Sequence, residues 1–69
     1  MSSVYKVIEI IGSSEKSWEE AARKAVELTA KSLKEIRIVE VKELDMRVEA
    51  GKVVEYRAKM RISFKYLPD

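Results

Sequence analysis

Apolar and β-branched side chains dominate the first segment of the chain in the manner of a β-strand. Residues 4–11 are rich in valine, isoleucine and tyrosine, and Gly12-Ser13-Ser14 follows them. This pattern predicts a strand over residues 4–11 that ends in a turn. Both alternating faces of the strand are mainly apolar, as in strands that are covered on both sides. One helix covers a single side, so we expect a neighbouring subunit to cover the other.

The next segment has the pattern of an amphipathic helix. Ser17 is followed three residues later by Glu20, which is the spacing of a capping box at a helix start. Apolar residues then recur at helical spacing and form one stripe: Trp18, Ala22, Ala25, Val26, Thr29 and Leu33. The stripe predicts a helix of about 17 residues that begins after Ser17 and runs to about Leu33.

Two long segments with alternating polarity follow the helix. We expect strands from about Ile36 to Glu49 and from about Val53 to Tyr66. The three residues between them, Ala50-Gly51-Lys52, include a glycine. A short loop of this kind between alternating segments is typical of a β-hairpin.

Opposite charges on the two strands select one register of this hairpin. Pairing residue 49 with residue 53 sets three acid–base pairs opposite one another: Glu43 and Lys59, Asp45 and Arg57, and Arg47 and Glu55. All three pairs are attractive, whereas a shift of two residues sets Asp45 against Glu55. The apolar phase also slips between Val41 and Leu44, which predicts a β-bulge or sharp bend around residues 40–44.

Composition limits the chemistry that the chain can perform. The 69 residues form one domain over residues 1–69, with a formal net charge of +2 and neither cysteine nor histidine. Disulfides, zinc fingers and catalysis by a histidine or cysteine side chain are therefore excluded. The remaining polar residues show no arrangement of nucleophile, base and orienting group, so we expect a protein that is not an enzyme.

The small size of the chain also predicts self-association. A domain of about 60 residues buries only about 60% of its unfolded surface, and chains this small usually need a disulfide, a metal or a partner subunit. The interleaved charges are not typical of a nucleic-acid-binding surface, and no apolar run is long enough to cross a membrane. We therefore expect a cytoplasmic oligomer of identical chains that binds neither nucleic acid nor membrane.

The predicted element order is β-α-β-β, an α+β fold with a three-stranded antiparallel sheet wrapped around one helix. In this order and in four segments the chain resembles the dodecins: Val4 to Ser14, Ser17 to Ala22, Val39 to Val41, and Tyr56 to Phe64. The resemblance implies a hollow homododecamer, built from trimers, that binds and stores a small ligand. Many dodecins bind a flavin, FMN or riboflavin.

The resemblance also indicates where a ligand would bind. It implies a flavin pocket at a two-fold axis, with Ile38 at the position of the flavin-stacking tryptophan and Arg57 at that of a flavin-binding glutamine. Asp45 faces Arg57. Both flavin-binding side chains are thus replaced. The chain is more similar to a calcium-binding branch, with which it shares a tryptophan near the helix start, Ile36-Arg37 and Asp45-Met46.

Calcium requires six to eight oxygen ligands, so one short chain must share them with neighbouring subunits. Glu9 and Glu19 are the candidate ligands. Three functions remain open at this point. They are a shell that stores or buffers a ligand such as calcium, a flavin-sequestering dodecin with an altered pocket, and a purely structural assembly.

Overall fold

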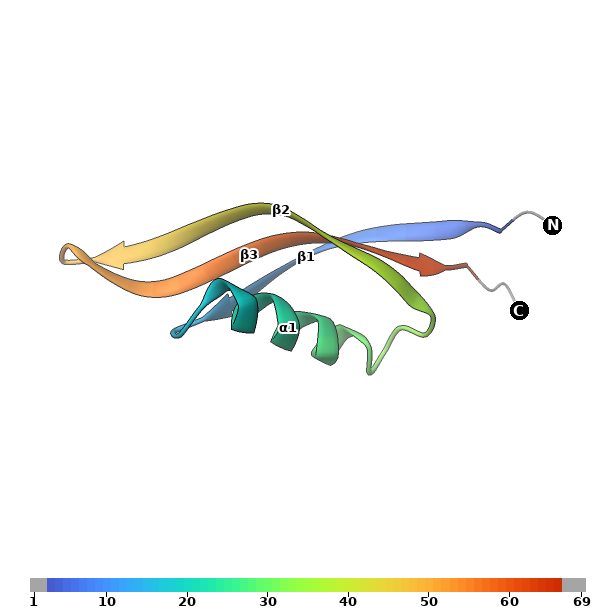
Figure 1. Cartoon of the computed structure of the whole chain (residues 1–69), viewed down its shortest axis with the longest axis horizontal. Coiled ribbons are helices and arrows are strands. Elements are labelled where there is room, and N and C mark those ends of the chain that lie inside the picture. The colour runs from blue at the N-terminus through green and yellow to red at the C-terminus, as the bar shows by residue number, and fades with distance from the viewer. Residues whose placement is uncertain (1–2, 67–69) are drawn as a thin grey trace.

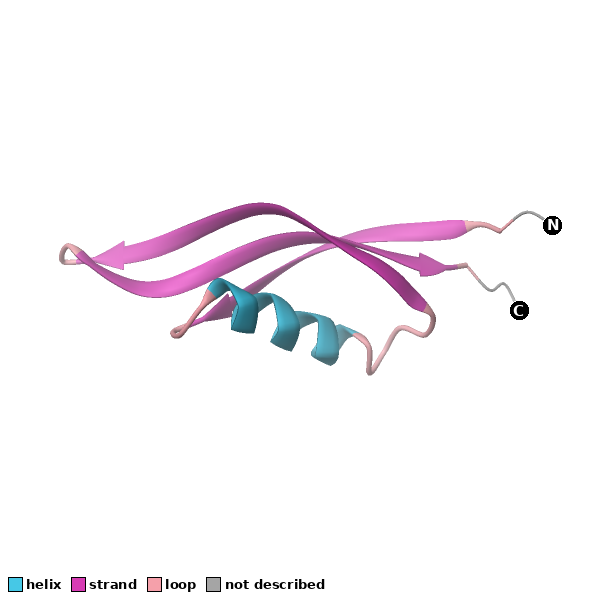
Figure 2. Ribbon diagram, in the orientation of Figure 1, coloured by secondary structure: helices cyan, strands magenta, loops and turns pink. Residues whose placement is uncertain are grey.

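The computed structural model describes residues 3–66 and has the element order β1-α1-β2-β3 (Figures 1 and 2). The bounds are Tyr5–Ser14 for β1, Trp18–Thr29 for α1, Ile36–Glu49 for β2 and Lys52–Lys65 for β3. The strands form one antiparallel sheet in the order β1-β3-β2, and α1 lies against one face of it. The predicted α+β fold with one helix and a three-stranded sheet is confirmed.

Helix α1 begins as predicted and ends earlier than predicted. The Ser17 side chain accepts a hydrogen bond of 3.0 Å from the backbone N–H of Glu20, which caps the first turn. The helix ends at Thr29 rather than near Leu33. Beyond it, the N–H groups of Lys31 and Ser32 bond to carbonyls three residues earlier, so the chain continues in tighter turns. Threonine and serine favour helices less than alanine or leucine, which agrees with this end.

Strand β1 continues through Gly12-Ser13-Ser14, so the turn predicted there is wrong. Gly12 pairs with Ala58 in the sheet, and helix α1 crosses directly above it. A Cβ atom at position 12 would overlap the carbonyl oxygen of Ala21 and lie 2.8 Å from the Cβ of Ala25. The glycine is therefore needed for the close approach of helix and strand.

The hairpin has a shorter loop than predicted. Glu49 pairs with Lys52, so the loop is the two residues Ala50 and Gly51, with φ angles of 51° and 73°. Two positive φ angles are characteristic of the type I′ turn that joins twisted strands. The three predicted acid–base pairs do lie opposite one another. The register shifts between Arg47 and Val48, and this shift compensates for the loop being shorter than predicted. The predicted bulge is confirmed by a second shift between Val41 and Glu43, and a third follows Ile36.

The core of the chain is small. Among the described residues the buried apolar side chains are Ala21, Ala58, Met60 and Ile62. The molecule measures 53 × 20 × 16 Å with a radius of gyration of 14.3 Å, whereas a compact chain of this length has a radius of about 11 Å. Figure 1 shows the reason: the β2–β3 hairpin extends far beyond the start of α1.

The sheet exposes apolar side chains on both faces. On the face that carries α1, the inner face, four residues of β2 remain about half exposed: Val41, Leu44, Met46 and Val48. We call them the inner strip. On the opposite, outer face an outer cluster is similarly exposed: Tyr5, Val7, Ile11 and Ile38. One chain leaves both surfaces uncovered.

Candidate functional site

The outer face of the sheet carries a ladder of opposite charges centred on β3. Three cations of this central strand face carboxylates on the neighbouring strands: Arg57 faces Asp45, Lys59 faces Glu43, and Arg61 faces Glu9. The shortest nitrogen–oxygen distances are 2.7, 3.4 and 3.9 Å, in that order. The carboxylates are therefore held with very different strengths along the ladder.

Asp45 is the carboxylate held most firmly in this ladder. Both of its side-chain oxygens accept hydrogen bonds of 2.7 Å from the guanidinium of Arg57. These hydrogen bonds lower the pKa of Asp45 and raise that of Arg57. On the inner face, Trp18 Nε1 donates a hydrogen bond of 3.1 Å to the backbone carbonyl of Asp45. Position 45 is thus fixed from both faces of the sheet.

Trp18 is the anchor that connects the helix start to the hairpin. Its ring meets that of Tyr56 edge to face, with centroids 5.1 Å apart. The sequence stripe indicated that Trp18 packs on the sheet. It contained no signal for the hydrogen bond to Asp45, because that bond depends on where the curved hairpin passes the helix.

The two positions expected to form a flavin pocket do not meet within one chain. Ile38 pairs with Ser63, which lies six residues along β3 from Arg57, a separation of about 20 Å. Ile38 is 65% exposed on the outer face and offers an aliphatic side chain. Arg57 is bound to Asp45. A pocket that uses both positions would need two copies of the chain.

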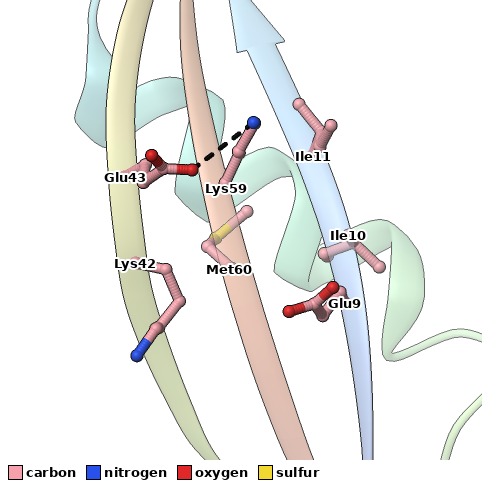
Figure 3. Close-up of a pocket in the computed structure, with 7 residues that line it drawn as sticks. All are labelled: Glu9, Ile10, Ile11, Lys42, Glu43, Lys59 and Met60. Carbon is pink, nitrogen blue, oxygen red and sulfur yellow. Dashed lines mark ion pairs between the residues drawn. The ribbon is translucent and has the colours of Figure 1, made fainter.

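The two candidate metal ligands also lie apart. Glu9 is on the outer face, where it lines a groove of about 720 Å³ together with Glu43 and Lys59 (Figure 3). Glu19 is on α1, at a second groove of about 510 Å³ formed with Val39 of β2 on the inner side. Within residues 3–66 no three acidic side chains gather in a way that would hold a metal ion. A single chain therefore forms no calcium site from these residues.

The groove around Glu9 brings together groups that the sequence did not single out as a site. Edge strands β1 and β2 contribute Glu9 and Glu43, and Lys59 of β3 lies between them (Figure 3). Glu9 is 78% exposed, and its nearest cation, Arg61, is 3.9 Å away. The alternation of β1 and β2 does place Glu9 and Glu43 on one face. Their common groove follows only from the order β1-β3-β2, which the sequence pattern leaves open.

Comparison with known proteins identifies the family. A model of the family "Dodecin" matches residues 4–67 of the chain. The chain belongs to the dodecin family. It is 48% identical over 66 residues to the calcium dodecin of Mycobacterium tuberculosis, a match that covers 96% of this chain and 93% of that protein. The family assignment and the resemblance to its calcium-binding branch are therefore confirmed.

Solved dodecin structures agree with this fold. The crystal structure of the M. tuberculosis calcium dodecin, described as a calcium-chelating antigen with a novel calcium-binding site, superposes with a TM-score of 0.85 at 50% identity. That match covers 97% of this chain and 96% of the other. A dodecin from Streptomyces coelicolor superposes with a TM-score of 0.92 at 24% identity, over 97% and 96% of the two chains. In the described residues no helix is long and apolar enough to cross a membrane.

Proposed function

We propose that the chain is the subunit of a self-associating, non-enzymatic dodecin that binds and buffers calcium between its subunits. The observation that carries this proposal is the 48% identity to a calcium dodecin over nearly the whole length of both chains. The structure adds physical support for two parts of it, namely the association of copies and the sharing of the ion between them.

Self-association is supported by the apolar surfaces that one chain leaves uncovered. The inner strip and the outer cluster lie on opposite faces of the sheet, so a single two-fold contact covers only one of them. Covering both needs two different contacts for each chain, and two such contacts build an assembly larger than a dimer. A homododecamer built from trimers, the form that the family resemblance implies, satisfies this requirement.

Sharing of the ion is supported by the arrangement of carboxylates. Calcium takes six to eight oxygens, and residues 3–66 of one chain gather no such set. Glu9 is the carboxylate that we assign to the ion first, because it is exposed and its contact with Arg61 is long. Glu43 lines the same groove, and Glu19 has no ion pair within residues 3–66. Copies that meet at the outer groove would bring the Glu9 and Glu43 oxygens of more than one chain together, whereas Glu19 lies on the other side of the sheet.

Flavin binding is the second candidate, and the structure favours it less. Ile38 provides no ring on which an isoalloxazine could stack, and stacked aromatic pairs contribute about 0.5–1.5 kcal/mol beyond their buried area. Arg57 is already bound to Asp45 through two hydrogen bonds. A flavin would therefore have to displace an ion pair without the compensation of a stacking partner.

Titration calorimetry on protein stripped with EDTA tests the calcium proposal. We expect heat on addition of calcium and a higher melting temperature in its presence, because an ion that binds only the folded assembly stabilises it. Glu9→Gln should weaken binding by about tenfold or more, the scale seen when a metal site loses a supporting group. Glu49→Gln, at the distant hairpin end, is the matched control and should bind as the parent does.

The outcomes separate the two candidates. If the addition of calcium produces no heat and leaves the melting temperature unchanged, the calcium proposal is contradicted. If Glu9→Gln and Glu49→Gln lose calcium affinity equally, Glu9 is not part of the site. Quenching of riboflavin fluorescence by the protein would instead favour the flavin alternative.

A further inference from the structure

Lys59 lies on the central strand of the groove around Glu9, between the two edge strands that supply its carboxylates (Figure 3). On β2 it faces Glu43, and on β1 it faces the apolar side chain of Ile11. The other two cations of the charge ladder are arginines. A lysine ammonium is a compact charge on a flexible stem and lacks the planar fork with which a guanidinium holds a carboxylate. The groove therefore contains the cation of the ladder that is most easily displaced.

The contact between Lys59 and Glu43 is correspondingly loose. The Nζ atom of Lys59 lies 3.4 Å from the nearest oxygen of Glu43, whereas Asp45 accepts two hydrogen bonds of 2.7 Å from Arg57. The Lys59 side chain is 42% exposed and that of Glu43 is 67% exposed. Exposed ion pairs of this kind are screened by water and contribute little to stability. The ammonium can therefore leave Glu43 for solvent at a small cost in free energy.

The charges that line the groove cancel one another. Two carboxylates, Glu9 and Glu43, are accompanied by two lysines, Lys42 and Lys59. Carboxylate oxygens suit a hard cation such as calcium, but a lining without net charge exerts little long-range attraction on a cation. The ammonium of Lys42 lies 3.8 Å from Glu40, which is not among the residues that line the groove. Lys59 is thus the lysine that neutralises a carboxylate of the groove itself.

We propose that Lys59 sets the affinity and the charge selectivity of this groove for cations. In the calcium-free protein its ammonium is the counter-ion of Glu43, and calcium binds by displacing that ammonium into solvent. A monovalent cation brings only the charge of the ammonium that it replaces, whereas a divalent cation brings twice that charge. The lysine therefore favours divalent cations. This inference rests on the proposed calcium function and adds to it the residue that competes with the ion.

Calcium titration calorimetry on protein stripped with EDTA tests the proposal with two substitutions that act in opposite directions. Lys59→Met removes the competing charge, so we expect calcium to bind more tightly by about threefold or more, the scale of one exposed ionic contact. Lys59→Arg keeps the charge and adds a fork that can hold Glu43 through two hydrogen bonds, so calcium should bind more weakly than in the parent. Damage to the fold would weaken binding in both variants and does not produce this pattern.

Competition by sodium measures the charge selectivity. The calcium titrations are repeated in sodium chloride and in choline chloride at equal ionic strength, so that general screening is the same in both salts. In Lys59→Met we expect sodium to weaken calcium binding more than choline does, because a monovalent ion small enough to reach the carboxylates no longer meets the ammonium. In the parent the two salts should have nearly the same effect. An equal difference between the salts in both proteins would show that Lys59 does not set the selectivity.

Lys52→Met is the matched control, because Lys52 is an exposed lysine at the far hairpin loop without an ion pair in the described chain. It should bind calcium as the parent does, and tightening equal to that of Lys59→Met would indicate an effect of net charge alone and overturn the inference. If the parent binds calcium and Lys59→Met binds it no more tightly, the inference is wrong and the proposed function stands. If neither protein binds calcium, both are wrong.

Discussion

At the scale of single residues, the Asp45–Arg57 pair makes stability depend on pH in a defined direction. Its two hydrogen bonds lower the pKa of Asp45 below the ordinary value of 3.8. A carboxyl group with a lowered folded-state pKa stabilises the fold above its ordinary pKa, and this stability is lost as pH falls through the folded value. Asp45→Asn should therefore lower the melting temperature at pH 7, and the difference from the parent should narrow below about pH 4.

Melting curves between pH 7 and pH 3 measure this difference. Glu49→Gln, whose partner Arg47 also contacts Glu55, is a control for the loss of an exposed carboxylate. A difference between Asp45→Asn and the parent that stays constant across the whole range would show that the charge of Asp45 does not stabilise the fold. The pKa values of Glu20 and Glu55 are lowered as well, by hydrogen bonds from Ser14 and Arg47 respectively, so the parent itself should lose stability in acid.

The sequence was sufficient to predict the Asp45–Arg57 pair, because opposite charges select the register of two long strands. The candidate ligand sites stay predictions. The family resemblance places Ile38 and Arg57 in a pocket at a two-fold axis, and within one chain about 20 Å of β3 separates the two positions. Glu9 and Glu19 lie on opposite sides of the sheet. A site shared between copies would depend on contacts that no sequence pattern within one chain encodes.

At the scale of elements, Trp18 fixes the hairpin against the start of α1. It donates a hydrogen bond to the Asp45 carbonyl and contacts the ring of Tyr56. Trp18→Phe retains a ring and removes the donor, so we expect a loss of about 1 kcal/mol in the free energy of unfolding. Urea denaturation measures it. Trp18→Leu, which also removes the ring contact, should lose more, and equal stability of Trp18→Phe and the parent would show that the hydrogen bond contributes nothing.

The predicted end of β1 and the predicted hairpin loop were wrong because the same residue type can have more than one structural role. Gly12 reads as a turn residue, and in the fold it instead allows α1 to approach β1. The charge ladder fixed the strand pairing from Glu43 to Arg47, but it contained no information on where an extra residue lies near the loop. The hairpin closes through Ala50 in a positive-φ conformation that alanine seldom adopts. Local composition alone would not have predicted that turn.

At the scale of the whole molecule, the chain is elongated and lacks the compact shape of a globular monomer. The hairpin extends beyond α1, and the helix covers β1 and β3 while β2 keeps its inner strip exposed. Large apolar patches on a small chain usually mark contacts with another protein. Since the patches occupy both faces of the sheet, removing either one should prevent closure of the assembly without unfolding the subunit.

Light scattering on protein eluted from a size-exclusion column measures the mass of the assembly and so tests this prediction. We expect a parent mass near twelve times the 8.0 kDa of one chain. Leu44→Glu puts a charge into the inner strip, where burial against another copy would cost several kcal/mol, so this variant should elute as a much smaller species. Leu28→Glu makes the same change at a leucine of α1 that is 67% exposed and belongs to neither surface, and it should retain the parent mass. A parent mass of one chain would contradict the assembly, and dissociation by Leu28→Glu alone would place the contact on the helix rather than on β2.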